Sequence, residues 1–337
     1  MQSETDLGHI VGDRYLLLDS IGQGGMADVN LARDQRDGHL VAVKWLARSR
    51  RSDAAYRARL LLEAELLAQV RHPNVVKLFD YGATADGVPY IVLEALIGET
   101  LHEYIARRGP TSVEDALPLI QQLAWALDAV HRAGLIHGDV KPHNVFLCGP
   151  LDHPESVKLI DFGFAQSSKG DCLSDGDTVA GTLEYMAPEQ ILSDPMDARA
   201  DIYSFGIVLF RWLTAELPFD TGPMLGLFAH HLASTAPPPS WLIDELHPGL
   251  DKLILAAMRK NPDNRYASMT DLLADLDCVI SGRDDVRGVP MYYQPDESCP
   301  SSEQGKRAYK ILNRGGRSAP PPAAGAAERP ASVPAEY

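Results

Sequence analysis

The sequence contains few cysteines, and none of them are paired in a motif. Cys148, Cys172, Cys278 and Cys299 are scattered through 337 residues and form no Cys-x-x-Cys pair. No group of histidines has the spacing of a zinc site. Disulfide frameworks and zinc sites depend on such patterns, so we expect neither of them, and we expect a reducing compartment.

Long apolar runs are also missing. The first ten residues, MQSETDLGHI, have no apolar core and therefore do not form a secretory signal. The best apolar segment, 202–209, is followed by Arg211 and is far shorter than the roughly 18 residues that span a bilayer. We therefore expect a cytoplasmic protein without an integral membrane segment.

Basic residues are fewer than acidic ones. The chain has 31 Lys and Arg against 46 Asp and Glu, a formal net charge of −15. A nucleic-acid-binding surface is usually basic, so we expect no nucleic-acid partner and interpret the acidity as favouring solubility. The hydrophobic fraction of 45% is ordinary for a globular protein, but 337 residues are many for one core. We therefore expect two lobes or domains.

The first part of the chain, 15–96, is typical of a small and mainly antiparallel β lobe. Its strand-like runs are rich in β-branched and aromatic residues and cover 15–21, 28–33, 40–45, 75–81 and 89–94. Asp-Gly pairs at 37–38 and 86–87 indicate hairpin turns. Apolar residues at helical spacing predict one helix, over 53–69.

The next part, 97–280, indicates a larger and mainly α lobe. A helix is predicted over 112–133, with a capping box of Thr111 and Glu114 at its start and Gly134 after its end. Further helices are expected over 199–214, 222–233, 250–258 and 269–280. The predicted fold class is therefore α+β with two lobes.

The two ends of the chain are expected to lie outside this domain of residues 15–280. Residues 1–14 are interpreted as an N-terminal extension. Residues 281–337 finish in a stretch of Pro, Ala and small polar residues, which cannot bury a core. We expect 281–337 to be a disordered tail.

A glycine-rich turn lies between the first two strand-like runs. It reads Ile21, Gly22, Gln23, Gly24, Gly25, Met26, Ala27, Asp28 and Val29. Glycines let backbone amides approach phosphate oxygens closely. Alone the pattern is weak, because many hairpins carry glycines, and its place between two strands disfavours a dinucleotide-binding fold. Lys44 ends the third strand near this turn, and Glu63 on the following helix is expected to pair with it, with Glu65 as a rival.

Chemistry-bearing residues gather in the loop 137–144, directly after the capped helix. Asp139 can accept the proton of an attacking hydroxyl, and Lys141 can neutralise charge on a transferring phosphoryl group. Asn144 can hold a metal through its amide oxygen. Asp161 follows a short apolar strand and supplies a carboxylate for magnesium.

With every large motif in order from about 15 to 280, the chain resembles the eukaryotic-type protein kinases, and among them the bacterial Ser/Thr kinases. The resemblance implies the bilobal protein-kinase fold, with ATP and Mg²⁺ as substrate and cofactor. It implies that Lys44 contacts the α- and β-phosphates and that Glu63 orients Lys44. Asp139 is implied as the catalytic base, with Asn144 and Asp161 as Mg²⁺ ligands.

The resemblance also implies an adenine site and several supporting contacts. The hinge contacts come from the backbone of Glu94 and Leu96, after a gatekeeper at Leu93, and the ring lies between Val29, Ala42 and Phe146. Thr182 and the run Ala187, Pro188 and Glu189 resemble the end of an activation segment. Asp201 is similar to the buried Asp that braces the catalytic loop, and Arg265 is expected to pair with Glu189.

Two positions depart from the family pattern. Ala27 replaces the third glycine of the glycine-rich turn, a change that we expect to be tolerated. Gly138 stands where many regulated kinases have Arg before the catalytic Asp, so activation by phosphorylation is in doubt. We therefore expect that replacing Ser174 and Thr178 by Ala changes kcat/KM toward a peptide by less than ~10-fold.

We expect a Ser/Thr protein kinase that phosphorylates protein substrates and itself, because Lys141 and Thr182 resemble the Ser/Thr subclass. Two alternatives are a pseudokinase scaffold, which the complete set of motif residues disfavours, and a small-molecule phosphotransferase, which the complete activation segment disfavours. Smaller questions stay open: Cys172 is a redox switch or an exposed thiol, and the basic stretch 306–317 is a docking or a solvated segment. The substrates, the activating signal, the oligomeric state and the role of the tail do not follow from the sequence.

Overall fold

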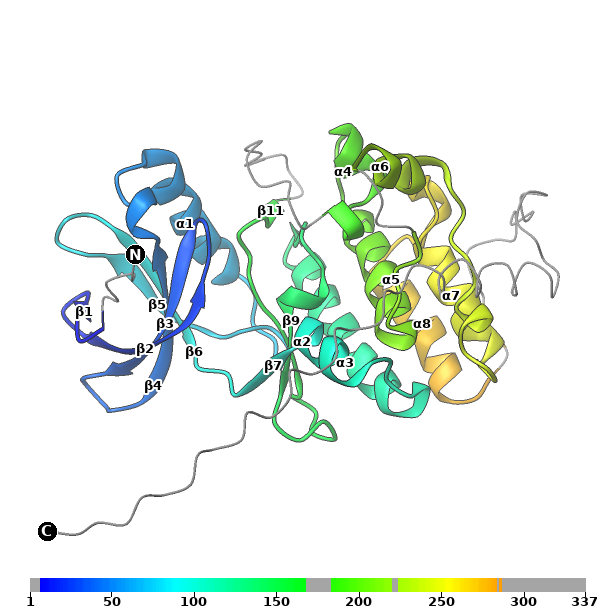
Figure 1. The fold of residues 1–337 in the computed structure, drawn as a ribbon, viewed down its shortest axis with the longest axis horizontal. Helices are drawn as coiled ribbons and strands as arrows, with labels where there is room; N and C mark the ends of the chain where they lie inside the picture. Colours follow the sequence, from blue (N-terminus) through cyan, green and yellow to red (C-terminus); the bar gives the residue numbers. More distant parts are fainter. Residues whose placement is uncertain (1–6, 168–182, 220–223, 284, 287–337) are drawn as a thin grey trace, which may run out of the picture. The chain divides into compact units, whose positions relative to one another are not determined.

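The structure of this chain is a computed structural model, and it describes residues 7–167, 183–219, 224–283 and 285–286. The predictions about Cys172, Ser174, Thr178, Thr182 and Cys299, and about the segment 287–337, lie outside the described residues. Within them, the predicted α+β class is confirmed: a sheet with one covering helix precedes a larger set of helices (Figure 1).

Six antiparallel strands form the sheet of the smaller lobe, in the order β1-β2-β3-β4-β6-β5. The strands are β1 (Ile10–Val11), β2 (Tyr15–Gln23), β3 (Ala27–Asp34), β4 (Leu40–Leu46), β5 (Leu78–Ala83) and β6 (Pro89–Glu94). Gly38 and Gly87 close the hairpins β3–β4 and β5–β6 with φ of +79° and +76°, a left-handed conformation that favours glycine. Helix α1 (Ala54–Leu67) packs against β4, β5 and β6 and buries Leu60 and Ala64.

Two differences from the predicted β lobe have a tertiary cause. The strand predicted over 75–81 begins only at Leu78, because Val75 and Val76 pair with Leu159 instead. Both valines are buried in the core of the helical lobe. Val11, in the predicted N-terminal extension, is buried in a cluster of side chains from the sheet, and its strand pairs with β2.

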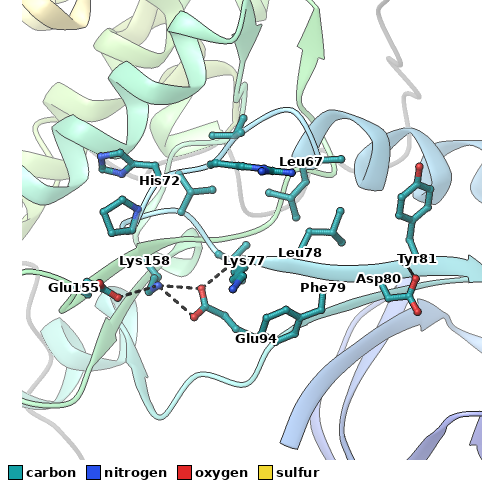
Figure 2. Close-up of a pocket in the computed structure, with 16 residues that line it drawn as sticks. Leu67, His72, Lys77, Leu78, Phe79, Asp80, Tyr81, Glu94, Glu155 and Lys158 are labelled. Carbon is teal, nitrogen blue, oxygen red and sulfur yellow. Dashed lines mark hydrogen bonds and ion pairs between the residues drawn. The ribbon is translucent and has the colours of Figure 1, made fainter. Parts of the chain in front are cut away.

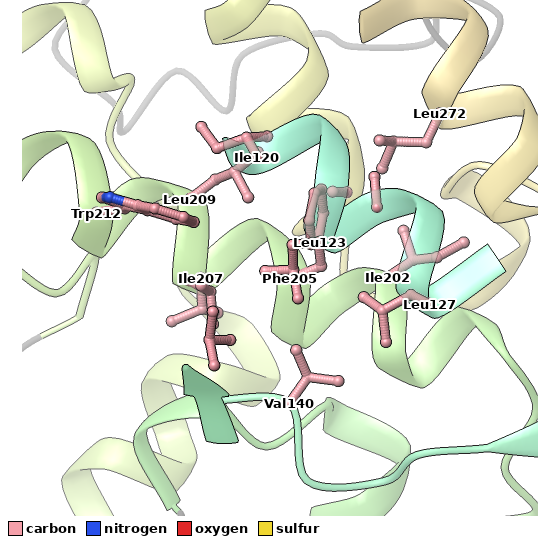
Figure 3. Packing of buried hydrophobic residues seen from close by; sticks show 14 of the residues in the cluster. Ile120, Leu123, Leu127, Val140, Ile202, Phe205, Ile207, Leu209, Trp212 and Leu272 are labelled. Carbon is pink, nitrogen blue, oxygen red and sulfur yellow. The ribbon is translucent and has the colours of Figure 1, made fainter. Parts of the chain in front are cut away.

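Among the described residues, the larger lobe contains seven α-helices. They are α2 (Leu101–Arg108), α3 (Val113–Arg132), α4 (Pro188–Leu192), α5 (Arg199–Thr214), α6 (Met224–Ala233), α7 (Pro248–Ala257) and α8 (Met269–Ile280). Leu123 of α3, Phe205 of α5 and Leu272 of α8 meet in its core (Figure 3). Among the described residues, no helix is both long and apolar enough to cross a lipid bilayer.

The cap of α3 differs from the predicted one. The helix begins at Val113, and the Ser112 hydroxyl accepts a hydrogen bond of 3.2 Å from the backbone N–H of Asp115. Thr111 is instead buried, and its backbone N–H donates to the carbonyl of Trp212. Tertiary contact with α5 therefore moves the cap one residue along the chain.

Short strands hold the loops between the helices, and the sequence predicted only one of them, the strand before Asp161. One sheet joins β7 (Gly98–Thr100), β9 (Val145–Cys148) and β10 (Val157–Leu159), and another joins β8 (Leu135–Ile136) and β11 (Gln166–Ser167). Short 3-10 helices cover Arg48–Arg50, Pro142–Asn144, Leu183–Tyr185, Pro239–Trp241 and Pro262–Asn264. The loop 137–144 connects β8 with β9, and Asp161 follows β10 closely, so paired strands fix both segments.

The end of the described chain adds one core residue. Val286, which the sequence prediction assigned to the tail, is 8% exposed and belongs to the core of the helical lobe. Its side chain lies where a Cβ on Gly249, near the start of α7, would project. Burial of this side chain stabilises the contact between α7 and the segment that follows α8.

Candidate active site

Lys44 is a buried cation that joins three separate elements. It lies on β4, and its Nζ is 2.6 Å from Oε1 of Glu63 on α1 and 3.0 Å from Oδ1 of Asp161. Glu65, the rival partner, is exposed. One ammonium group thus links the sheet, helix α1 and the loop after β10, although Lys44 and Asp161 are 117 residues apart in the sequence.

The charges in this group support one another. Burial alone would lower the pKa of Lys44, but the carboxylates of Asp161 and Glu63 raise it well above its usual value. Burial raises the pKa of Glu63, and Lys44 opposes that effect. The pKa of Asp161 is held below its usual range, because Lys44 and the N–H of Gly163 outweigh burial. At neutral pH the site therefore contains a charged lysine and an ionised Asp161.

Asp161 adopts an uncommon backbone conformation with φ of +63°, which Asp tolerates better than most residues. Its Oδ1 also accepts a hydrogen bond of 3.1 Å from the backbone N–H of Gly163. The side chain is nevertheless 42% exposed. One oxygen is therefore pinned, while the carboxylate stays open to solvent or a ligand.

Asp139 is the buried carboxylate of the loop 137–144. Its Oδ2 lies 2.7 Å from Nζ of Lys141 and accepts a hydrogen bond of 2.9 Å from the amide nitrogen of Asn144. Its Oδ1 is buried and has no hydrogen-bond partner among the described residues. Burial raises the pKa of Asp139, and Lys141 partly offsets that rise. The loop therefore presents a carboxylate oxygen with free acceptor capacity.

Asp201, near the start of α5, holds the backbone of the loop 137–144 in place. Its carboxylate accepts hydrogen bonds of 2.8 Å from the backbone N–H groups of His137 and Gly138. Nε2 of His131 on α3 lies 2.9 Å from the same carboxylate. The predicted brace is confirmed. The sequence did not indicate His131, because its helix position alone does not distinguish it from a surface histidine.

Gly138 occupies a place where a side chain meets two obstacles. Its φ is +75°, and a Cβ built on it would lie 2.9 Å from the carbonyl oxygen of Phe164. The Gly138 carbonyl in turn accepts a hydrogen bond of 2.8 Å from Nε2 of Gln190 on α4. The loop therefore packs tightly against the segment that follows Asp161.

Glu189 and Arg265 form the expected ion pair. The guanidinium donates two hydrogen bonds to the carboxylate, of 2.6 and 2.8 Å, and both residues are buried. Such two-point contact between planar groups fixes orientation as well as distance. The pair ties α4 to the segment before α8, and the prediction is confirmed.

The glycine-rich turn forms the hairpin between β2 and β3. In its register Gly22 pairs with Val29 and Gln23 with Asp28, and Gly24 donates a backbone hydrogen bond of 3.0 Å to Ala27. A Cβ on Gly24 would lie 2.9 Å from that Ala27 carbonyl, which explains the glycine there. Cε of Met26 lies 3.7 Å from the Cβ position of Gly163, so the hairpin tip reaches the segment after Asp161.

The other predicted ATP contacts are distributed over five strands, β2, β3, β4, β6 and β9, and the segment after β6. Ala42 of β4 is buried and pairs with Leu93 of β6, while Val29, Leu96 and Phe146 are half-buried. Ile21 on β2 and Glu94 at the end of β6 complete the set. Their roles toward adenine stay predictions.

Glu94 faces a separate cavity of about 880 Å³, lined mainly by 67–81 together with Glu155 and Lys158 (Figure 2). Its carboxylate accepts hydrogen bonds from Nζ of Lys158, at 3.0 Å, and from the backbone N–H of Lys77, at 2.7 Å. The side chain is committed to these contacts. Any contact of Glu94 with adenine must therefore come from its backbone.

Comparison with known proteins identifies the family of this chain. The family model of the protein kinase domain matches residues 15–275. The chain is 36% identical over 277 residues to the serine/threonine-protein kinase PknB of Mycobacterium leprae, and the match covers 81% of this chain and 44% of that protein. The serine/threonine-protein kinase pkn3 of Myxococcus xanthus is 33% identical over 288 residues, which cover 83% of this chain and 53% of that protein.

The chain thus spans only about half the length of the curated relatives that it matches. The match includes the glycine-rich turn, the loop 137–144 and Asp161, around which the site is built. We conclude that this chain belongs to the protein kinase domain family.

Proposed function

We propose that this chain is a Ser/Thr protein kinase that transfers the γ-phosphoryl group of ATP to hydroxyl groups of protein substrates, including its own. The observation that carries the proposal is Lys44, held at 2.6 Å from Glu63 and 3.0 Å from Asp161. The names of the relatives, which are serine/threonine-protein kinases, support the same chemistry. We further propose that residues 15–280 are the catalytic domain and that the protein acts in the cytoplasm.

Lys44 is the residue that binds the phosphates in this proposal. Its charge is secured by the two carboxylates, and Glu63 fixes the direction of its side chain. The backbone amides between Ile21 and Val29 line the hairpin tip above it and cover the phosphate oxygens. The adenine lies against Val29, Ala42 and Phe146 and meets the backbone of Glu94 and Leu96.

Asp161 and Asn144 fit the ligand set of Mg²⁺, which prefers oxygen donors. The carboxylate of Asp161 is partly exposed, and the amide nitrogen of Asn144 is used on Asp139, which leaves its amide oxygen for a metal. Bound Mg²⁺ supplies positive charge to the phosphate oxygens as negative charge develops on them.

Asp139 accepts the proton of the attacking hydroxyl through its unpaired Oδ1. The oxygen of that hydroxyl forms a bond to the γ-phosphorus, the bond from phosphorus to the β-phosphate oxygen breaks, and ADP leaves. Lys141, 2.7 Å from Asp139, keeps this carboxylate in place and offsets charge on the moving phosphoryl group.

Phosphoryl transfer from radiolabelled ATP to a generic basic protein tests the proposal. Asp139→Asn should lower kcat by at least ~10², because the proton acceptor is lost. Asp275→Asn is the matched control, since Asp275 is also a buried carboxylate but lies on α8. Near-normal autophosphorylation by the Asp139→Asn protein contradicts the assignment, and binding of ATP without transfer by the wild type indicates a pseudokinase.

A further inference from the structure

Arg59 is a buried cation on the same face of α1 as Glu63, one helical turn earlier. Its side chain is only 5% exposed, which is rare for arginine. Nε donates a hydrogen bond of 3.0 Å to the carbonyl of Gly163, and the guanidinium carbon lies 4.4 Å from the ring centroid of Phe164. Arg59 therefore contacts the two residues that follow Asp161 and Phe162.

Gly163 transmits this contact to Asp161. While its carbonyl accepts the hydrogen bond from Arg59, its own N–H donates a hydrogen bond of 3.1 Å to Oδ1 of Asp161. That same oxygen lies 3.0 Å from Nζ of Lys44. Helix α1 thus reaches Asp161 along two routes, one through Glu63 and Lys44 and the other through Arg59 and Gly163.

Gly138 in the loop 137–144 lies against the backbone of Phe164 and offers it no charged side chain. A Cβ built on Gly138 would lie 2.9 Å from the Phe164 carbonyl oxygen, which leaves no room for a side chain without a shift. The left-handed φ of +75° adds strain for any other residue. Phe164 therefore contacts a guanidinium from α1, whereas position 138 presents only backbone to it.

The burial of Arg59 is incompletely compensated. Its Nη2 is buried and has no hydrogen-bond partner among the described residues. An unpaired buried donor destabilises the fold, and an apolar side chain of similar volume at such a place is often neutral or stabilising. Stability therefore gives a poor account of an arginine here, whereas the contact with Gly163 gives a specific one.

We propose that Arg59 is a positioning residue that couples α1 to Asp161 through Gly163. The coupling keeps the carboxylate of Asp161 next to Lys44. It requires no cation at position 138, and therefore no phosphate that would pair with such a cation. The inference rests on the proposed function, since it assigns Asp161 to the metal that accompanies ATP.

The test uses the whole chain after phosphatase treatment. Calorimetry measures the binding of ATP to it at increasing Mg²⁺ concentration. Arg59→Met replaces the guanidinium by an apolar side chain of similar length. We choose it because an apolar side chain at a buried position should let the protein fold. The Mg²⁺ concentration for half-maximal ATP binding should rise by about tenfold, the equivalent of one hydrogen bond from a charged donor. Arg59→Lys keeps the charge and one donor and should restore part of that loss.

Arg57→Ala is the matched control. Arg57 lies two residues earlier on α1, and its Nε also donates to a backbone carbonyl, that of Arg51, which is remote from Asp161. The Mg²⁺ dependence of this variant should stay within about twofold of the wild type, well under the energy of one net hydrogen bond. A change equal to that of Arg59→Met overturns the proposal.

Melting temperatures separate positioning from a structural role. If Arg59→Met melts at a lower temperature but binds Mg²⁺ and ATP like the wild type, Arg59 is structural and the inference is wrong. If the phosphatase-treated wild type loses its ATP binding while the phosphorylated form keeps it, the inference is also wrong. If the wild type binds no ATP in either form, the proposed function itself fails.

Discussion

Replacing Lys44 by Met tests the central ion pair of the site. The substitution removes a cation that is 7% exposed and leaves the carboxylates of Glu63 and Asp161 without their shared partner. Losing one partner of a buried pair destabilises a protein by about 3–5 kcal/mol. Asp161 is 42% exposed, and Glu63 can take up a proton, so we expect a loss near the lower end of that range.

Catalysis should fall further than stability accounts for. Without the ammonium group the phosphates lose a positioning contact, and kcat should decrease by at least ~10², which corresponds to about 2.7 kcal/mol in the activation barrier. Steady-state kinetics with a peptide at saturating ATP measures this loss. Denaturant unfolding of the same preparation measures the stability separately.

Lys158→Met is the matched control for this prediction. Lys158 is also 7% exposed, and its Nζ lies 3.0 Å from a carboxylate, that of Glu94, but it is not part of the proposed chemistry. We expect a comparable loss of stability with kcat within about threefold of the wild type, since buried pairs of this kind act on stability. An equal fall of kcat in the two variants refutes the reasoning. A kcat of Lys44→Met within tenfold of the wild-type value refutes it as well.

The pH dependence of stability provides a second check on Lys44→Met. Lys44 lowers the pKa of Glu63, so the variant should raise the pKa of Glu63 further in the folded state. A carboxylate with a raised folded pKa stabilises the fold at low pH and loses that contribution as the pH rises through the folded value. The stability difference from the wild type should therefore shrink as the pH falls.

Three other predictions concern separate parts of the molecule. Lys141→Met should move the acid limb of kcat/KM to higher pH, because Lys141 lowers the pKa of Asp139 and the base must be ionised; a pH–rate profile checks this. Burial and Arg265 lower the pKa of Lys260 to about 7, so the wild type should gain stability from pH 7 to 9 relative to Lys260→Met, as measured by denaturant unfolding. A chain that ends after Val286 should melt like the full protein, whereas one that ends after residue 282 should lose about 1–2 kcal/mol of buried apolar contact, measured by the same method.

The sequence alone predicted the elements whose pattern is local. Helices α5 and α8 have the predicted bounds, 199–214 and 269–280, because their apolar residues repeat with a helical period over three or more turns. The Asp-Gly pairs at 37–38 and 86–87 predicted the hairpins because glycine is favoured where φ is positive. The order of the motifs was sufficient to indicate the kinase fold.

Only the tertiary structure decided which distant residues meet. The strand bonds of Val75 and Val76, the choice of Ser112 as the cap and the role of His131 depend on partners more than 30 residues away. Strands of two to four residues, such as β8 and β9, have too few residues for a period to be detected. The buried hydrogen bond of Arg59 likewise depends on Gly163, which lies 104 residues later in the sequence.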